Sequence, residues 1–568
     1  MSSLCKDRPP VARTRTEAAS ALVPVPVRLL VPVLVSVLVP VLVMLVLGLW
    51  GLDRGGMWRD EAVTFEVAHR SVPQIWRLLH GVDAVHGLYY LVMHTVLSGW
   101  AVFARPGEVV LRLPSVLGAA ATAGLVAALG VRLCRPRVGL WAGLLYAVTP
   151  LAGHYAQEGR SYALVSAGVA ASTLLLVRAV RGGGWWRYGV VAGVTCVLHE
   201  FAVLALLAHA CALALARVRG RVWRAWGCAV GGVALVLLPV VVVSQGQAAQ
   251  VAWLGVPDLR AAGRLLEGFA GAPGLLLVPC LVLAGVGVRG GPRGELSLGR
   301  VALPLVAVPP VVLLTVSQVR PFYDERYVLY ALAGMPLLVA SGADRVAGAM
   351  RRLRAGGRTA PARAPLLGVL TIGLVLVSRL PVLEADRDAD RRPDNLAAVS
   401  RVAGRVMRPG DPLLFLPAFG RRAALTYPEE FRRTRDVALS VPAPVDGSLY
   451  GREVGADELR RRLGRLDRVW VVAQTYALSP GWSSRSPVER LKRTVMDEEF
   501  EPRAEFVRKG STLRLYVRRP WFQAGSEGPG RVRPSASAAR RESSGTGARP
   551  SPGRSPVSRP VPPRPGSS

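Results

Sequence analysis

Long apolar runs alternate with short arginine-rich loops over most of the chain. Many of the runs are near the ~20 residues that a transmembrane helix needs. The pattern predicts a polytopic, all-α membrane protein with about 11 transmembrane helices and further helices at the membrane surface. The runs lie at about 29–51, 109–131, 138–153, 162–180, 188–216, 226–244, 273–289, 300–318, 326–343 and 364–382.

The run 188–216 is too long for one span. A single helix would measure ~43 Å at ~1.5 Å per residue, against a hydrocarbon core of ~30 Å. Basic residues bound the run at both ends. We therefore expect a hairpin of two short helices, with His199 and Glu200 at its outer tip.

The stretch from His86 to Phe103 decides the topology. If it spans the membrane, the basic cluster at 132–137 lies outside, against the positive-inside rule. Its Tyr, His and Trp residues are typical of the headgroup level. We expect an interfacial or re-entrant segment, which places Asp60, Glu158 and the loop 317–327 on one outer face.

The composition divides the chain into four parts. Residues 1–28 are predicted to be a disordered cytoplasmic lead, and residues 29–384 a transmembrane domain whose outer loop spans 52–108. From 385 to 520 polar helices mix with short strands, which predicts a small extracytoplasmic α/β domain. Residues 521–568 are rich in Ser, Pro, Gly and Arg and are predicted to be a disordered basic tail.

The formal net charge of +33 does not point to nucleic acid. The arginines lie between apolar runs and in the tail, and positive-inside loops account for most of them. The six cysteines are scattered without a CxxC pair, so neither a disulfide framework nor a cysteine metal site is expected.

Acidic and basic residues between the apolar runs are the candidates for chemistry. Asp60 and Glu61 follow the first span; they either act on a substrate or only begin a surface helix. Glu158 and Arg160 lie where charges are costly and usually functional, although they could simply pair with each other. The cations and hydroxyls of the last outer loop are either phosphate ligands or interfacial anchors.

These groups suit transfer from a phosphate-activated lipid donor. An ionised carboxylate can take a proton from an acceptor hydroxyl, and guanidinium groups can stabilise the departing phosphate. The sequence identifies no certain cofactor, and carboxylates could hold a divalent cation. The residues expected to bind substrate are His86, Arg160, His199, Glu200, Arg320, Tyr323, Arg326 and Tyr327, and those expected to be catalytic are Asp60, Glu61 and Glu158.

Five motifs in this order resemble the GT-C glycosyltransferases. WRDEA follows the first span, and HGLYYLVMH, LRLPS, YAQEGRSYAL and ERYVLYAL come after it. The branch is similar to the bacterial protein O-mannosyltransferases and the lipid A aminoarabinose transferase. The resemblance covers roughly residues 45–345 and leaves the C-terminal part uncovered.

The resemblance implies a polyprenyl-phosphate sugar donor, an outer active site and inversion at the anomeric carbon. It implies Asp60 as the base with Glu61 beside it, Glu158 as a second acid, and Arg320 and Arg326 as phosphate contacts. The hairpin tip carries a lysine in the aminoarabinose transferase, and here it carries His199 instead.

The sequence therefore predicts a multi-pass glycosyltransferase of the cell membrane whose acceptor is a glycan, lipid or protein hydroxyl. The alternative is a transporter or flippase of lipid-linked intermediates. This alternative predicts charged residues at mid-membrane and internal repeats. An inactive scaffold that binds a partner through its outer domain is a third hypothesis.

Overall fold

The computed structural model describes residues 27–104, 107–251, 253–288, 292–354, 363–388 and 392–520. The predicted tail and nearly all of the predicted N-terminal lead lie outside these residues.

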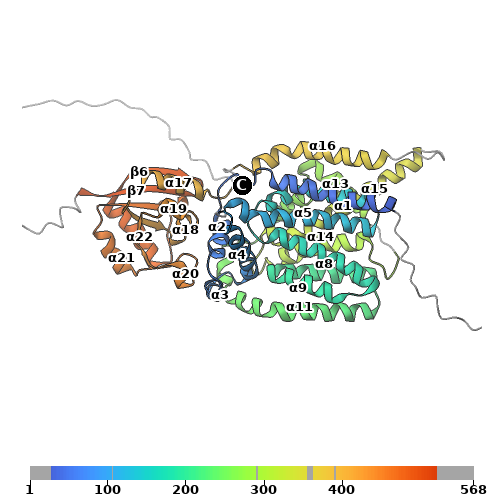
Figure 1. Ribbon diagram of the computed structural model, residues 1–568, viewed down its shortest axis with the longest axis horizontal. Helices are drawn as coiled ribbons and strands as arrows, with labels where there is room; N and C mark the ends of the chain where they lie inside the picture. The colour runs from blue at the N-terminus through green and yellow to red at the C-terminus, as the bar shows by residue number, and fades with distance from the viewer. Residues whose placement is uncertain are drawn as a thin grey trace, which may run out of the picture. The chain divides into compact units, whose positions relative to one another are not determined.

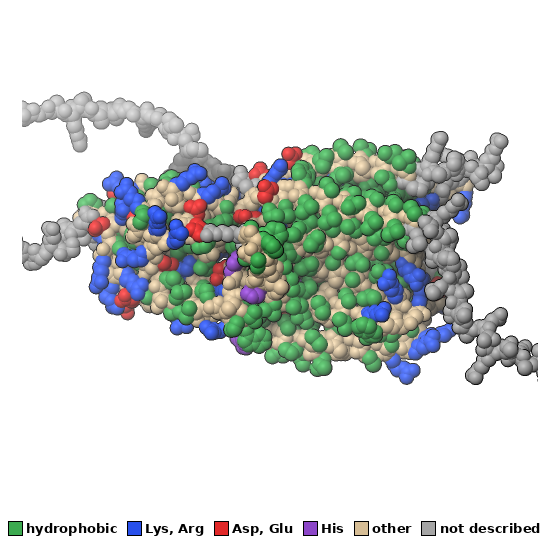
Figure 2. Space-filling model, viewed as in Figure 1, with side chains coloured by type: hydrophobic (Ala, Val, Ile, Leu, Met, Phe, Trp, Pro, Cys, Tyr) green, Lys and Arg blue, Asp and Glu red, His purple; other side chains and the backbone are tan. Residues whose placement is uncertain are grey.

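Apolar helices form a bundle in the N-terminal part of the chain (Figure 1). Their outward side chains are hydrophobic over the flank of the bundle seen in Figure 2, and Lys and Arg gather at one of its ends. The predicted helical, polytopic fold class is confirmed. The helices are α1 (Val27–Leu49), α5 (Glu108–Leu133), α6 (Pro136–Val148), α8 (Tyr162–Gly182), α9 (Trp185–Leu198), α10 (Val203–Ala216), α11 (Gly220–Gly246), α13 (Leu277–Gly287), α14 (Leu298–Val316), α15 (Gly334–Arg354) and α16 (Arg363–Asp386).

The number of spans differs from the prediction of about 11. Within the described residues, seven helices are long and apolar enough to cross a membrane, or eight if α12 (Leu259–Ala270) and the helix bent from it by 67° count as one span. The other predicted runs also fold as helices, but α6 has 13 residues and α9 and α10 have 14 each. These lengths are short of the ~20 residues that a span needs.

The run 188–216 forms two helices, as predicted. His199 leaves the helical conformation with φ −162° and ψ 120°, and this residue separates α9 from the 3₁₀ turn that leads into α10. The change of direction therefore falls at the predicted tip.

Three helices lie at one end of the bundle: α2 (Arg59–Ala68), α3 (Val72–Leu79) and α4 (Gly87–Ala101). Ser71 and Gln74 form a capping box that begins α3, whose apolar face buries Ile75 and Leu78. Because α4 has only 15 residues, it is too short to span, and it packs on α2. This agrees with the expectation of an interfacial or re-entrant segment.

The C-terminal part contains a five-stranded sheet in the order β2-β1-β5-β7-β6. The strand β1 (Pro412–Leu416) runs parallel to both β2 (Arg435–Asp436) and β5 (Arg468–Gln474). The hairpin of β6 (Phe500–Arg508) and β7 (Ser511–Arg518) adds two antiparallel strands. The small sheet region is confirmed. Its principal helices are α17 (Leu396–Val406), α21 (Ala456–Gly464) and α22 (Pro487–Glu499).

One hydrophobic core joins the sheet to the membrane-end helices. Ala62 of α2 and Tyr89 of α4 belong to the same cluster of buried side chains as Leu396, Leu413 and Phe415. Figure 1 shows the C-terminal elements gathered at the end of the bundle where α2, α3 and α4 lie. The C-terminal domain is therefore packed against the segment that carries Asp60.

Candidate active site

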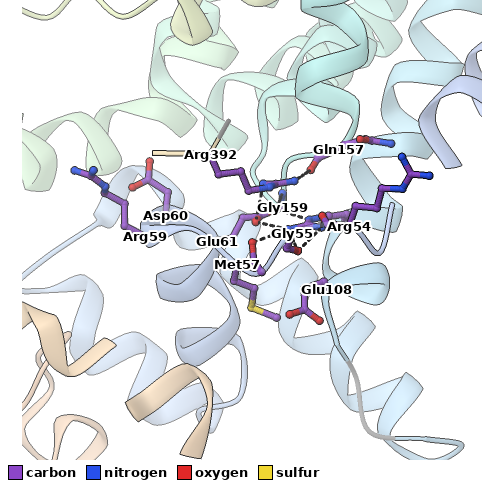
Figure 3. A network of polar contacts seen from close by, with 12 residues as sticks. Arg54, Gly55, Met57, Arg59, Asp60, Glu61, Glu108, Gln157, Gly159 and Arg392 are labelled. Atoms are coloured by element: carbon purple, nitrogen blue, oxygen red, sulfur yellow. Dashed lines mark hydrogen bonds and ion pairs between the residues drawn. The ribbon is translucent and has the colours of Figure 1, made fainter. Parts of the chain in front are cut away.

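The adjacent carboxylates of Asp60 and Glu61 point in different directions. Both lie in the first turn of α2, where consecutive side chains are about 100° apart around the helix axis. Figure 3 shows the Asp60 side chain directed away from the polar network that surrounds Glu61. The two residues therefore occupy different environments.

Glu61 is fully buried in a closed network of cations. Its Oε1 accepts hydrogen bonds from Arg112 Nε at 2.8 Å and from the backbone N–H of Gly159 at 2.9 Å. Its Oε2 accepts from Arg112 Nη2 at 2.9 Å and from Arg392 Nη1 at 3.1 Å. Glu61 lines neither cavity described below, so the structure favours a positioning role over the predicted catalytic one.

The same network keeps Glu61 ionised. Burial alone would raise the pKa of this carboxyl, but the charges of Arg112 and Arg392 hold the pKa below its ordinary value. A permanently charged, fully bonded carboxylate is a structural anchor and a poor proton acceptor.

Arg112 also holds the loop that precedes α2. Its Nη1 donates to the carbonyl oxygen of Leu52 at 2.8 Å and to that of Arg54 at 3.2 Å, and its Nη2 donates to that of Gly56 at 3.2 Å. The arginine of the LRLPS motif therefore joins the Glu61 carboxylate to the backbone that leads to Asp60.

Asp60 is accessible and pairs with a single arginine. Its Oδ2 accepts from Arg326 Nη1 at 2.7 Å, and the Asp60 side chain is 24% exposed. Arg326 also pairs with Asp324 at 3.2 Å. Asp60 and Arg326 line two cavities, so both side chains can meet ligands that enter from either side.

The first cavity has a volume of about 620 Å³ and combines an apolar wall with arginines. The apolar wall comes from Phe201, Val203, Leu237, Val241 and Phe322, and the cationic residues are Arg59, Arg160, Arg326 and Arg422.

Arg160 is buried in the wall of this cavity. Its Nη2 lies 2.7 Å from His86 Nε2, and its Nη1 donates to Thr64 Oγ1 at 3.2 Å. Since arginine can only donate, His86 accepts through Nε2 and carries its proton on Nδ1. In the described part of the chain no carboxylate pairs with Arg160, which excludes the alternative that Arg160 is satisfied by Glu158.

Both predicted histidines of the site are neutral. Burial, together with the charge of Arg160, lowers the pKa of His86 well below its ordinary value, and the same causes lower the pKa of His199 to about 3. The ring of His199 lies 5.1 Å from that of Tyr327, centroid to centroid. His86 and His199 therefore present neutral, polar ring edges to the first cavity and contribute no positive charge there.

The remaining predicted binding residues divide into two groups. Glu200 lines the first cavity and accepts from Ser244 at 2.8 Å, and Tyr327 lines the cavity as well. Arg320 and Tyr323 line neither cavity. Arg320 is exposed, and its guanidinium lies over the ring of Phe322 at 5.3 Å from the ring centroid. Their predicted binding roles are therefore not supported.

The second cavity, of about 540 Å³, is lined by carboxylates, tryptophans and the arginines Arg59, Arg326 and Arg392. Glu158 is buried there, and its Oε1 has no hydrogen-bond partner in the described structure. Burial raises the pKa of Glu158 to about 7. The tryptophans are Trp58 and Trp253, and the carboxylates are Asp60, Glu158, Asp324 and Asp386.

Several residues of the site were missed at the level of sequence. Arg112 is a charge inside an apolar run and could have been identified on that ground. Arg392, Trp253, Arg422 and Tyr450 carry no comparable signal, because only the folded chain brings them to the site.

Within the described ranges, no group of three or more His, Cys, Asp and Glu residues could hold a metal ion.

Residues 91–244 match the family of dolichyl-phosphate-mannose-protein mannosyltransferases. This region includes Glu158, Arg160 and His199. No curated protein is a significant match to the sequence.

Solved structures of ArnT from Cupriavidus metallidurans share the fold. The apo structure is 13% identical with a TM-score of 0.52, and the alignment covers 84% of this chain and 97% of that one. The structure bound to undecaprenyl phosphate is 14% identical, with the same TM-score and coverage. The predicted resemblance to the GT-C glycosyltransferases is thereby confirmed, and the chain has their fold.

Proposed function

We propose that this protein transfers a sugar from a polyprenyl-phosphate donor to an acceptor hydroxyl, with inversion, on the extracytoplasmic side of the cell membrane. The observation that carries the proposal is the place of Asp60. Its carboxylate lines a cavity suited to a lipid phosphate and a second cavity suited to a hydroxyl-bearing acceptor. The related family and the ArnT fold support the same reaction class.

The first cavity fits the donor. Its apolar wall can accommodate isoprene units near the linking phosphate, and Arg160 and Arg326 can bind that phosphate through charge-assisted hydrogen bonds. Undecaprenyl phosphate is the ligand of one ArnT structure that shares this fold. A polyprenyl phosphate is therefore the carrier that we propose.

The second cavity fits the acceptor. Indole rings are amphipathic surfaces on which sugar rings can pack, and Trp58 and Trp253 supply two of them. Carboxylate oxygens accept hydrogen bonds from hydroxyl groups, which favours an acceptor that presents hydroxyls. A glycan, a glycolipid or a hydroxyl side chain of a protein meets this requirement.

In the proposed reaction Asp60 removes the proton of the acceptor hydroxyl as its oxygen attacks the anomeric carbon. The bond from that carbon to the phosphate oxygen breaks as the new glycosidic bond forms. Polyprenyl phosphate leaves, and Arg160 and Arg326 stabilise the charge that develops on it. Attack from the second cavity and departure into the first give inversion.

The distribution of charge supports the orientation. Figure 2 shows Lys and Arg at the end of the bundle remote from the C-terminal domain, which fits a cytoplasmic surface under the positive-inside rule. A reporter fused between Arg132 and Arg137 should lie in the cytoplasm. A reporter found outside the cell would reverse the proposed side of the reaction.

Asp60→Asn tests the assignment of the base. With labelled polyprenyl-phosphate sugar and purified protein in nanodiscs, the variant should lose about 10²- to 10⁴-fold in turnover. Its melting temperature should stay close to that of the wild type, since the amide oxygen can still accept from Arg326. Full activity of Asp60→Asn at equal protein level would show that another group is the base.

A further inference from the structure

Part of the first cavity belongs to the C-terminal domain. Arg422, Leu449 and Tyr450 line it together with residues of the membrane bundle. Arg422 is the first residue of the short helix α18 (Arg422–Thr426), and Tyr450 lies just before β4 (Arg452–Glu453). These residues follow Asp60 by more than 350 positions in the chain, and only the seating of the domain brings them to the site.

Specific bonds fix that seating. The hydroxyl of Tyr427, at the end of α18, donates to Glu108 Oε1 at 2.9 Å and accepts from the backbone N–H of Met57 at 2.9 Å. Asp394 accepts from the backbone N–H of Arg59 at 2.9 Å and from its Nε at 3.2 Å. The contacts to Met57 and Arg59 lie within three residues of Asp60. They therefore fix the position of the C-terminal domain relative to the proposed base.

The loop that carries Tyr450 is seated in the same way. Leu449 packs against the buried cluster that includes Ile75 and Leu78 of α3, and Arg77 Nη1 donates to the carbonyl oxygen of Val445 at 3.1 Å. The face that the domain presents to the cavity is therefore built from anchored segments.

Arg422 forms no ion pair with the described residues. The residue is only 6% exposed, its Nε is buried without a hydrogen-bond partner, and its guanidinium lies over the ring of Phe419 at 4.7 Å. The charge of Arg422 does act on the buried carboxylate of Asp394, but Asp394 makes its ion pair with Arg59. Burial of a guanidinium without an ion pair is costly, and binding of an anion offsets that cost.

Arg160 has the same character and faces the same cavity. It too is 6% exposed with a buried, unpartnered Nε. It belongs to the membrane bundle, whereas Arg422 belongs to the C-terminal domain. Two buried arginines on separate structural units thus face one space.

We propose that Arg422, with the hydroxyl of Tyr450, forms a second oxyanion subsite that binds a phosphate or carboxylate on the head group of a substrate. This inference rests on the proposed function, which assigns the linking phosphate to Arg160 and Arg326. The second anion is carried either by the transferred sugar or by the acceptor. The C-terminal domain then selects the substrate in addition to covering the site.

Three probes test the subsite on the full chain in nanodiscs. They are undecaprenyl phosphate, undecaprenyl phosphoryl-glucuronate and mannose 6-phosphate. Arg422→Gln should weaken binding of at least one of the two anionic-head probes by about tenfold or more, since a charge-assisted hydrogen bond is lost. Its effect on undecaprenyl phosphate should be far smaller. Loss confined to the glucuronate lipid assigns the anion to the donor, and loss confined to mannose 6-phosphate assigns it to the acceptor.

Two further variants keep the test independent of folding. Tyr450→Phe removes only the hydroxyl and should weaken the same probe as Arg422→Gln, while Arg422→Lys should restore part of the affinity. If wild type binds undecaprenyl phosphate but Arg422→Gln and Tyr450→Phe bind every probe as wild type does, the subsite is refuted and the proposed donor stands. If wild type does not bind undecaprenyl phosphate, the proposed function itself fails.

Discussion

Replacement of Glu61 by Gln should destabilise the protein, because it breaks a buried ion network. Each carboxylate oxygen accepts two hydrogen bonds, from Arg112 and Gly159 on one side and from Arg112 and Arg392 on the other. In glutamine the amide nitrogen must face donors and Arg112 is left unpaired in the core. Removal of one member of a buried pair typically costs about 3–5 kcal/mol, a large part of the ~5–15 kcal/mol that stabilises a typical protein.

The assay is thermal unfolding in nanodiscs together with sugar transfer. Glu61→Gln should lower the melting temperature and the turnover together, since Arg112 also fixes the loop before Asp60. The double variant Glu61→Met, Arg112→Met should be less destabilised than the sum of the single variants, because neither member of the fully buried pair is left without its partner and only the less buried Arg392 loses its carboxylate.

Glu458→Gln is the matched control. Glu458 also pairs with two arginines, Arg461 and Arg462, but on the surface, where such pairs contribute little. We expect no measurable change in its melting temperature. If Glu61→Gln melts like the wild type and yet loses turnover, the positioning role is wrong and Glu61 takes part in the chemistry.

Two other changes probe the cavity and the domain junction. Burial raises the pKa of Glu158 to about 7, so the stability of wild type relative to Glu158→Gln should be greatest below pH 4.5 and fall as the pH rises through 7. Between pH 4.5 and a pH above 7, the free energy of unfolding of the wild type should fall by on the order of 3 kcal/mol relative to that of Glu158→Gln. If the melting temperatures of the two proteins change in parallel over this pH range, the prediction is contradicted. Tyr427→Phe should lower the free energy of unfolding by about 1–3 kcal/mol and reduce turnover, because it removes the hydrogen bonds of the hydroxyl with Met57 and Glu108. The control Tyr476→Phe changes a side chain that is 53% exposed and should do neither.

The sequence pattern predicted the bundle well, because apolar length and loop charge report directly on how a helix meets a bilayer. It placed the break at His199, and it separated the sheet-containing C-terminal part. It overestimated the number of spans, because it counted α6, α9 and α10 as crossings and these helices have only 13 or 14 residues.

The prediction of the site was weaker where partners are distant in the chain. Asp60, Glu158, Arg160 and Arg326 come together as expected, because all four belong to loops or helix ends on one side of the bundle. Arg392 binds Glu61 although the two residues are 331 positions apart in the chain, and no local sequence pattern predicts such a contact. Arg320 precedes Arg326 by six positions and yet lines neither cavity, so its role stays a prediction.

The adjacent pair Asp60 and Glu61 explains how this chain combines a rigid anchor with a reactive group. One helix turn sends Glu61 into a core where Arg112 and Arg392 keep it charged, and the same turn sends Asp60 toward two cavities. The cost of burying Glu61 is met by its arginines, and the result is a fixed direction for its neighbour. Asp60 therefore remains partly accessible, and among the described residues its carboxylate pairs with Arg326, an environment that a substrate can approach and that suits the base proposed above. The order of the two residues then has a physical reason. After their exchange, the shorter carboxylate would stop one methylene short of Arg112, and a longer, less constrained one would lie at the cavities. Asp60→Glu with Glu61→Asp should accordingly lose both stability and turnover, measured as above, although the composition is unchanged.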